Sequence, residues 1–536
     1  MAVLLALTAA STWADEHFDI VSFQVDGNTL LPAAELAQLT APFVGTARVY
    51  GDIQQALEAL TVAYHQHGYG TVQVFVPEQQ LSGGIVRIEV RENTIGNIVV
   101  SGNQHFSEDN IRASLPPLQS GKAPNLQQIS EAVQLSNENA AKQVSVVLGS
   151  STEEGKIDAE VKVVDNDPLR VLATLDNTGS SSTGKWRTGI ALQDANLFNR
   201  DQTGTLAYTT SPDSPHGVQV DLYSLGYRIP FYALGDSIDL TYGKSNVNTP
   251  GASPTLGGEL GFTGKGETYG VHWNHFFSRQ GENSSKLVFG IDYKRINSTC
   301  NVDGVEISTI GPTPPVASCV PYTLMPWSAT YSVSHRGIGR SIDYNIGISR
   351  NWATGASYID TTTDERNDRY SYLTPGSRDT VDDFVILRAG ASLLEALSKD
   401  WQVHIAANAQ YAKDPLVSAE QFGLVGAMAV RGFTERAVTA DSAVVVNAEL
   451  YTPQLPLKGN LRLLTFYDIG RGYNSNIGNS DIPASMTVSS MGVGARYGLG
   501  RDLMVKLDLA RVGSSGYSAT EKRGDLYAHL SATLGF

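Results

Sequence analysis

Strict alternation of apolar and polar residues runs through the last two thirds of the chain and limits the folds that it can adopt. The pattern is clearest at the end, where small or apolar residues occupy every second position: Leu526, Ala528, Leu530, Ala532, Leu534 and Phe536. Similar runs cover residues 238–243, 286–293 and 503–510. A period of two residues is typical of β-strands that bury one face. This part of the chain is therefore expected to be all-β.

Two all-β architectures alternate in this way, a soluble sandwich and a membrane barrel. Residues 169–536 are too many for a single sandwich core. A barrel turns its apolar face to lipid and its polar face to the lumen, and closure leaves no unpaired backbone in hydrocarbon. At roughly 23 residues per strand with its connections, about sixteen antiparallel strands fit. We expect a membrane β-barrel over residues 168–536 whose last strand pairs with the first, with Phe536 at the membrane interface.

Composition removes several other classes of protein. No apolar stretch approaches the roughly 20 residues that a membrane-spanning helix needs. The net charge of −15 argues against nucleic-acid binding. The ten histidines are scattered, and no glycine-rich loop followed by lysine is present to bind phosphates. We therefore predict no catalytic residue, no metal and no cofactor, and we do not expect an enzyme.

Two short features point to an exported protein. Residues 1–14 contain an apolar run that ends in small residues, which indicates a signal peptide cleaved near Ala14, although no basic residue precedes the run. Cys300 and Cys319, the two cysteines of the chain, lie in one Gly- and Pro-rich stretch. In an oxidising compartment this spacing favours a local disulfide over a metal site, with two unpaired thiols as the alternative.

An internal repeat divides the first third of the chain. Val25-Asp26-Gly27-Asn28-Thr29 recurs in outline as Val100-Ser101-Gly102-Asn103-Gln104, 75 positions later. Repetition at this period predicts two copies of one small unit, at residues 18–92 and 93–167. Each copy is expected to fold as βααββ, with its longer helix opened by Asp52 or by Asn125 in a capping box.

Each repeated unit would expose the edge of a small sheet, to which an extended peptide could add as a further strand. In the first copy the closing strand at residues 71–76 contains Val72, Val74 and Val76, which are our candidates for binding a partner. The alternative is that the two units are only spacers in front of the barrel.

Two motifs in the barrel region carry the most specific signal. Val430-Arg431-Gly432-Phe433 lies in a stretch without strand pattern near residues 415–440, and Phe466-Tyr467-Asp468-Ile469-Gly470 follows in a strand context. Glu449 places a second carboxylate on the inner face of the intervening strand. An arginine can bind a carboxylate through two parallel hydrogen bonds, which would anchor a loop inside a wet lumen.

With these motifs the chain resembles the outer-membrane transporters of two-partner secretion, the filamentous haemagglutinin and haemolysin transporter family. Residues 175–179 and 194–197 resemble the family's first barrel strands, and residues 227–231 resemble the segment in which the family has a proline at a periplasmic turn. The resemblance implies that Arg431 lies at the tip of a loop folded into the lumen and faces Asp468, with Phe466, Gly470 and Glu449 nearby. It also implies that the repeated units are POTRA domains in the periplasm and that the barrel lies in the outer membrane.

The function implied by this resemblance is secretion of one partner protein. The partner would be an exoprotein such as an adhesin, a haemolysin or a contact-dependent toxin, recognised unfolded by the POTRA domains and passed through the lumen of a monomeric, lipid-embedded barrel. Related alternatives are an insertase for outer-membrane proteins and a passive porin. Many relatives carry an N-terminal plug helix, for which we expect no room between Ala14 and a strand that begins at Phe18.

Overall fold

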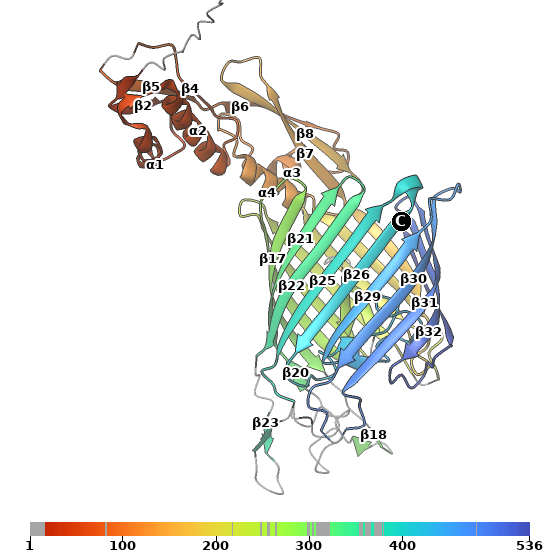
Figure 1. The fold of residues 1–536 in the computed structure, drawn as a ribbon. Helices are drawn as coiled ribbons and strands as arrows, with labels where there is room; N and C mark the ends of the chain where they lie inside the picture. Colours follow the sequence, from red (N-terminus) through yellow and green to blue (C-terminus); the bar gives the residue numbers. More distant parts are fainter. Residues whose placement is uncertain are drawn as a thin grey trace, which may run out of the picture. The chain divides into compact units, whose positions relative to one another are not determined.

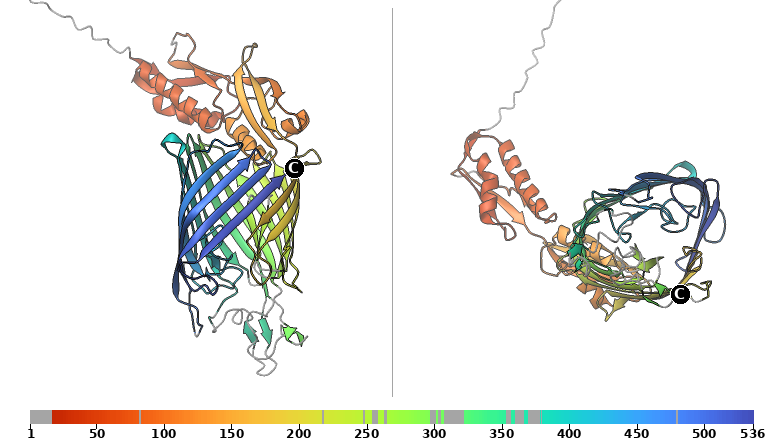
Figure 2. Two further views of the ribbon diagram at one scale, coloured as in Figure 1. Left: turned by 90° about the vertical axis from the view of Figure 1, so that its right-hand side faces the viewer. Right: turned by 90° about the horizontal axis from the view of Figure 1, so that it is seen from below.

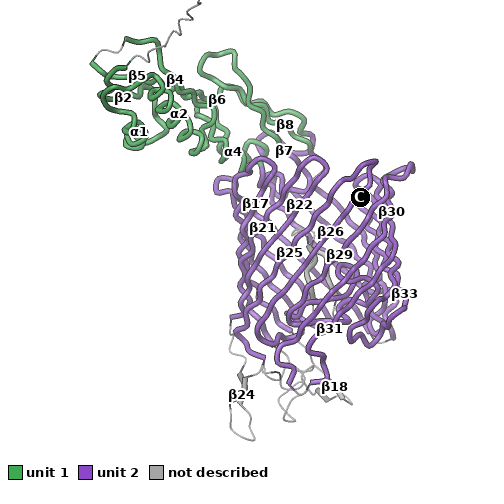
Figure 3. Tube along the Cα trace, viewed as in Figure 1, with its two compact units in different colours: residues 1–103, 111–133, 144–164 green, residues 104–110, 134–143, 165–536 purple. Residues whose placement is uncertain are grey.

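The computed structural model describes most of the chain, with gaps at its start and in later loops. The described residues are 17–80, 83–216, 218–246, 249–253, 258–262, 265–296, 301–302, 305–306, 322–352, 357–359, 366–368, 378, 380–478 and 480–536. The predicted signal peptide and the predicted pair Cys300 and Cys319 lie outside them. Two compact units are present (Figure 3), one drawn from residues 1–103, 111–133 and 144–164 and the other from residues 104–110, 134–143 and 165–536.

The first repeated unit is a small sheet covered by two helices (Figure 1). Its elements are β1 (Phe18–Ile20), β2 (Ser22–Asp26), α1 (Ala33–Thr40), the 3-10 turn η1 (Ala41–Phe43), β3 (Gly45–Arg48), α2 (Tyr50–Gln66), β4 (Gln73–Phe75) and β5 (Ile85–Arg91). In the sheet order β2-β5-β4, β2 is parallel and β4 antiparallel to β5. Leu36, Leu60 and Ile88 are buried in its core. The predicted βααββ order is confirmed, with the short pair β1–β3 added.

The start of α2 corrects one detail of the prediction. The helix begins at Tyr50, so Val49 is its N-cap and Asp52 is its third residue rather than its cap. The Asp52 carboxylate accepts a hydrogen bond from the N–H of Val49 at 2.9 Å. A carboxylate in the first turn satisfies a free N–H group and favours the positive end of the helix dipole, so Asp52 still stabilises this helix start.

The second repeated unit has the same order of elements. It comprises β6 (Thr94–Ser101), α3 (Glu108–Ala113), α4 (Leu126–Ser136), β7 (Lys142–Ser150) and β8 (Lys156–Asp165), with sheet order β6-β8-β7. Asn125 caps α4 as predicted, because its Oδ1 accepts the N–H of Gln128 at 3.1 Å. Ala159, Val161 and Val163 are buried along one face of β8. No helix in the described part of the chain is long and apolar enough to cross a membrane.

Antiparallel strands form a closed barrel from Leu169 to the end of the chain (Figure 1). They are β9 (Leu169–Asp176), β10 (Arg187–Leu197), β11 (Gln202–Thr210), β12 (Asp221–Phe231), β13 (Asp236–Ser245), β16 (Gly266–Phe276), β17 (Asn283–Ile296), β20 (Tyr322–Leu324), β21 (Pro326–Gly337), β22 (Arg340–Asn351), β25 (Val385–Ala396), β26 (Gln402–Ala412), β29 (Ser442–Tyr451), β30 (Asn460–Tyr473), β31 (Ser485–Leu499), β32 (Leu503–Ser515) and β33 (Leu526–Gly535). β20 and β21 both pair with β17 and continue one another, so these elements make sixteen strands around the barrel, as predicted.

Short elements extend the connections between the barrel strands. They are the pairs β14 (Thr249–Ser253) with β15 (Gly258–Phe262), β18 (Asn301–Val302) with β19 (Val305–Glu306), β23 (Ser357–Ile359) with β24 (Arg366–Asp368), and β27 (Phe422–Gly423) with β28 (Thr439–Ala440), together with the 3-10 turn η4 (Ser398–Asp400). The pair β27–β28 belongs to the long connection between β26 and β29, residues 413–441.

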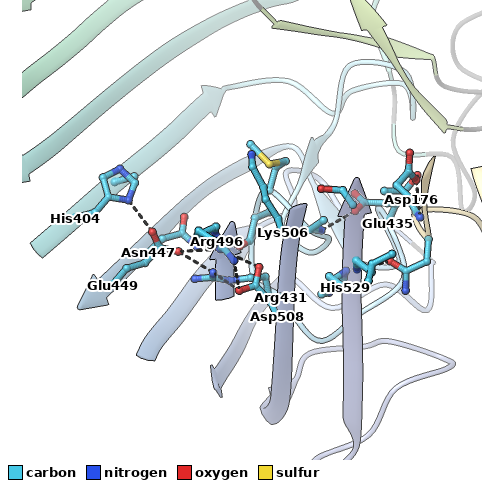
Figure 4. A pocket seen from close by; sticks show the side chains of 18 of the residues that line it. Asp176, His404, Arg431, Glu435, Asn447, Glu449, Arg496, Lys506, Asp508 and His529 are labelled. Carbon is cyan, nitrogen blue, oxygen red and sulfur yellow. Dashed lines mark hydrogen bonds and ion pairs between the residues drawn. The ribbon is translucent and has the colours of Figure 1, made fainter. Parts of the chain in front are cut away.

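Side chains alternate between the two faces of the barrel wall, as the sequence pattern predicts. On β13 the outward Leu240 is exposed, whereas the inward Asp239 and Thr241 are buried. On β32 the outward Leu509 is exposed, and its neighbour Asp508 points into the lumen (Figure 4). Seen along its axis, the barrel is a ring of strands with irregular segments inside it (Figure 2).

β33 and β9 close the ring. Residues 531–535 pair with residues 172–176, and Phe536 exchanges backbone hydrogen bonds with Val171 at 2.9 and 3.2 Å. Beyond the end of β9 the side chain of Asn177 continues the contact: it donates to the Ala528 carbonyl at 2.6 Å and accepts from the Leu530 N–H at 2.8 Å. The predicted pairing of the last strand with the first is confirmed, and one side-chain amide lengthens it.

Candidate functional site

The site is built from the long connection between β26 and β29, hereafter the inner loop (residues 413–441). Its side chains contact residues that point into the barrel from β17, β25, β29 and β30, and the backbone N–H of Gly432 contacts β33. The inner wall of the barrel therefore satisfies polar groups of this loop.

Arg431 is the central residue of the inner loop (Figure 4). Its Nε and Nη2 donate to the two carboxylate oxygens of Asp468 on β30, each at 2.8 Å. Its Nη1 donates to Glu449 on β29 at 2.7 Å. The guanidinium lies 3.5 Å from the ring centre of Phe466, so it stacks on an aromatic face as well. Asn447 orients Asp468 through a hydrogen bond to the same carboxylate at 2.8 Å.

Burial determines how strongly this ion pair stabilises the docked loop. Arg431 is 3% exposed and Asp468 0% exposed. An exposed pair of this kind contributes about 1 kcal/mol or less, whereas removal of one partner from a buried pair costs about 3–5 kcal/mol. Burial alone would lower the pKa of Arg431, but Asp468 and Glu449 raise it above its ordinary value. The guanidinium is therefore held in its charged form, and the pair acts as a strong anchor.

The other three residues of the motif at positions 430–433 pack closely against the barrel wall. Val430 lies against Gly470, where an added Cβ would come within 3.2 Å of a Val430 methyl group. Gly432 has φ +100°, and an added Cβ would meet that of Ala510 at 3.2 Å, so both backbone conformation and space call for glycine there. Phe433 is fully buried.

Phe433 belongs to an apolar cluster formed by the inner loop and the inner face of the wall. From the loop come Leu424, Val425, Val430, Phe433, Val438 and Ala440, and from the wall come Ala443, Val445, Met486, Val488 and Val512. Burying apolar surface is favourable by about 25 cal/mol per Å², so this cluster adds a non-directional contribution to the directional ion pair. The tip of the inner loop is thus packed like a small protein core inside the barrel.

Hydrogen bonds from the last strand and its preceding loop complete the tip. The backbone N–H of Gly432 donates to Nε2 of His529 on β33 at 2.9 Å. The N–H and hydroxyl of Thr434 both donate to one carboxylate oxygen of Glu521, at 3.1 and 2.8 Å. Burial alone would raise the pKa of Glu521, but hydrogen bonds from Thr520, Ser518 and Thr434 lower it. This carboxylate therefore stays an acceptor for the loop.

A second anchor holds the start of the inner loop. Glu420 is buried and pairs with Lys294 on β17 at 2.7 Å and with Arg388 on β25 at 3.1 Å. Gln410 donates to the backbone carbonyls of both Glu420 and Asp441, so it ties the two ends of the loop together. This anchor rests on strands other than those that hold Arg431.

A third anchor lies where the inner loop returns to β29. Asp441 forms a buried ion pair with Arg378 and accepts hydrogen bonds from the N–H of Leu416 and the side chain of Gln421, each at 3.0 Å, and from the N–H of Ser475 at 2.9 Å. One carboxylate therefore fixes both ends of the loop and a neighbouring connection.

Beside the Arg431 anchor lies a cavity of about 510 Å³ (Figure 4). Charged side chains of both signs line it, among them Glu449, Arg496, Lys506 and Asp508. The side chain of Met428 is exposed there, next to the tip of the inner loop. A cavity with this lining holds water and polar chain more readily than an apolar ligand. Within the described residues, no group of three or more His, Cys, Asp or Glu side chains is arranged to hold a metal ion.

The structure brings most of the predicted site residues together. Val430, Arg431, Gly432 and Phe433 meet Glu449, Phe466, Asp468 and Gly470. Val72 lies elsewhere, buried in the core of the first repeated unit, and Val74 and Val76 are partly buried against the same core. What β4 offers is its backbone edge, which among the described residues is paired on one side only.

Sequence reasoning missed the residues that anchor the loop away from its tip. Glu420, Asp441 and Arg378 lie in stretches without periodic pattern, so no spacing signal pointed to them. His529 could have been found, because it alternates with Ala528 and Leu530 in the last strand and therefore points inward.

This architecture defines a class: an outer-membrane β-barrel preceded by POTRA domains, with an arginine-tipped loop docked in the lumen. Residues 155–497 match the model of the haemolysin secretion/activation protein family ShlB/FhaC/HecB, and residues 18–93 match the ShlB-type POTRA domain. The chain belongs to this family of two-partner secretion transporters. It is an outer-membrane protein whose POTRA domains lie in the periplasm.

Individual relatives are similar over most of their length. The outer membrane transporter CdiB of Escherichia coli is 23% identical over 84% of this chain and 72% of its own. The heme/hemopexin transporter protein HuxB of Haemophilus influenzae is 21% identical over 86% of this chain and 77% of its own. The solved structure of CdiB from Escherichia coli superposes with a TM-score of 0.73, with 21% identity, over 99% of this chain and 93% of that one.

Proposed function

We propose that this transporter binds one unfolded exoprotein with its POTRA domains and passes it through the barrel lumen after the inner loop leaves its docked position. The observation that carries the proposal is the buried pair of Arg431 and Asp468, which holds a long loop inside the lumen through a side chain of the wall and not through the backbone ladder of the barrel. Such contacts can be broken without opening the backbone ladder of the barrel. The activity is transport, not catalysis.

Recognition of the partner is proposed to occur by strand addition at β4. Its pairing with β5 covers residues 73–75, and beyond them the Gln79 side chain binds the backbone of Arg87 in place of a strand, accepting its N–H at 2.8 Å and donating to its carbonyl at 2.7 Å. A partly exposed amide is easily displaced, so an incoming strand could pair with the free edge of β4 or, in line with β4, with this part of β5. The contacts would be made by backbone, which suits a cargo that arrives unfolded.

The transporter is proposed to act as a monomer, because β33 pairs with β9 of the same chain and the lumen closes within one molecule. Its cargo is proposed to be a secreted exoprotein of the two-partner type. This is supported by relatives that are named for different cargoes, a heme/hemopexin transporter protein and a hemolysin transporter protein.

Cross-linking during secretion tests the route. A photoreactive residue placed at Met428, which is exposed in the lumen cavity, should capture the partner protein in transit. The same residue at Ile348, exposed on the outer face, is the control and should capture none. Capture at Ile348 but not at Met428 would overturn the lumen route. Deletion of residues 18–91 should abolish capture at Met428 while ion conductance remains; capture in the deletion variant would show that the first POTRA domain is a spacer.

A further inference from the structure

A row of one tyrosine and three charged residues crosses the outer face of the barrel near the ends of four neighbouring strands. Tyr223 on β12 is in register with Lys244 on β13, Lys244 with Glu267 on β16, and Glu267 with Arg295 on β17. All of these side chains except the half-buried Glu267 are exposed. Lys265, just before β16, is exposed beside them. With Asp221, Asn246 and their neighbours, these residues line a shallow hollow of about 330 Å³.

The strand directions place this hollow at the cell surface. β9 enters the barrel directly after the second POTRA domain, so its first residue lies at the periplasmic side, and each following strand reverses direction. β13 and β17 therefore end at the outer side, and β12 and β16 begin there. Lys244, Arg295 and Glu267 all lie at the outer ends of their strands.

A row of aromatic residues fixes the depth of the hollow in the membrane. Two positions further into the membrane on the same strands lie Tyr242, Tyr269 and Tyr293, also in register, with ring centres 5.0 and 6.4 Å apart. Aromatic girdles of barrels lie at the boundary between hydrocarbon and headgroups. Two residues along a strand span about 6–7 Å. The charged row therefore lies at the depth of the lipid headgroups.

The charges in the hollow are unevenly paired. Lys244 forms an ion pair with Glu267 at 3.2 Å, and Tyr269 donates to the same carboxylate at 3.3 Å. The Asp221 carboxylate accepts the hydroxyl of Tyr208 at 2.7 Å. Arg295 and Lys265 have no ion-pair partner among the described residues. Two cations thus face the headgroup region with their donors available, and Lys244 lies next to them.

We propose that this hollow, formed by Lys244, Lys265 and Arg295 above the tyrosine row, binds a phosphate group of an anionic lipid of the outer leaflet. Guanidinium and ammonium groups are the donors that bind phosphate, and a basic cluster at a membrane surface attracts anionic headgroups. The tyrosine rings below contact the first part of the acyl chains. The site would hold the transporter beside a particular lipid on one side of its barrel.

Native mass spectrometry of the full-length transporter tests this site. The detergent-purified protein is mixed with a bis-phosphorylated outer-leaflet glycolipid or with the same lipid after removal of its phosphates, in the presence of chelator so that divalent cations cannot bridge to the carboxylates. We expect the phosphorylated lipid to be retained and the dephosphorylated lipid to be lost. Equal retention of both lipids would overturn the proposal.

Variants locate the binding on the barrel. The triple variant Lys244→Gln, Lys265→Gln and Arg295→Gln should weaken retention of the phosphorylated lipid about tenfold or more. The control is Arg350→Gln with Arg471→Gln, two exposed arginines on β22 and β30, which should leave retention unchanged. Heat-modified migration on gels reports folding of each barrel. If the triple variant does not fold, Lys265→Gln and Arg295→Gln are measured singly; retention unchanged in the folded variants, or lost equally in the control, would refute the site.

Discussion

The backbone N–H of Gly432 donates its hydrogen bond to Nε2 of His529, at 2.9 Å, and so joins the tip of the inner loop to the strand that closes the barrel. Because Nε2 accepts this bond, it carries no proton. A neutral imidazole suits this position, because Arg431, the residue before Gly432, already supplies the positive charge that pairs with Asp468 and Glu449.

Replacement of His529 tests this bond. His529→Leu removes the acceptor and leaves the buried N–H of Gly432 unpaired, which costs about 1–3 kcal/mol of loop docking. We expect ion conductance in planar bilayers to rise several-fold, with the barrel still folded. His529→Gln, whose amide oxygen can accept the hydrogen bond, is the control, and its conductance should be close to that of the unsubstituted protein. Equal conductance of the leucine variant and the parent would contradict the assignment.

Loss of the Arg431 anchor should impair secretion. Arg431→Ala or Asp468→Ala leaves a buried charge without its partner, which costs about 3–5 kcal/mol of docking. We expect the barrel to insert normally and the release of the partner protein into the medium to fall several-fold, because a loop without its anchor stays loose in the lumen and competes with the cargo for space. The double variant should lose less docking free energy than the two single variants lose together, because it leaves no unpaired member of this pair buried. Arg350→Ala, an exposed cation on the outer face, serves as control; normal release from both single variants would refute a role for the pair.

Gly470 should tolerate no side chain. A Cβ there would lie 3.0–3.2 Å from methyl groups of Val445, Val488 and Val430, so Gly470→Val fills the space that Val430 occupies. We expect the inner loop to be displaced, which raised conductance and faster proteolysis of the loop would report. Gly498→Val on β31 is the matched control, because an added Cβ there meets no atom closer than 4.0 Å. Identical behaviour of the two variants would contradict this packing.

Acid should weaken the second anchor. Burial alone would raise the pKa of Glu420, but Lys294 and Arg388 hold it below its ordinary value of 4.5. Glu420 thus has a lower pKa in the docked loop than in the released loop. Its carboxylate therefore favours docking above pH 4.5, and this contribution is lost as the pH falls through the pKa of the docked state. We expect conductance to rise only at pH values below 4.5, as this carboxylate takes up its proton. Glu420→Gln should raise conductance at neutral pH and abolish this part of the pH dependence; an unchanged pH profile in that variant would exclude Glu420 as the titrating group.

The regular parts of this protein could be predicted because their patterns are local. Alternation in residues 526–536 predicts the last strand and its inward and outward faces, and the repeat at Gly27 and Gly102 predicts two small α/β units. The capping of α2 was misplaced because Asp52 can stabilise the helix from the third position as well as from the cap. Helix starts depend on backbone angles that the side chain alone does not determine.

The site could be predicted only where a motif marked it. Arg431, Asp468 and Glu449 stand in recognisable strings or on an alternating strand, and the structure brings them together. Glu420 and Asp441 meet Lys294, Arg388 and Arg378 across sequence separations of 126, 32 and 63 residues, in geometry set by the curvature of the closed barrel. Such pairings follow from tertiary structure and leave no spacing in the sequence.

The anchors of the inner loop rest on different strands: Arg431 on β29 and β30, and Glu420 on β17 and β25. These two groups of ion pairs share no side chain, so the contacts of one group can break while those of the other remain. If the loop leaves its docked position during passage, as proposed above, we expect it to do so in steps, with a half-released loop as a discrete intermediate. In single-channel recordings we would then expect a subconductance level between the closed and the fully open state.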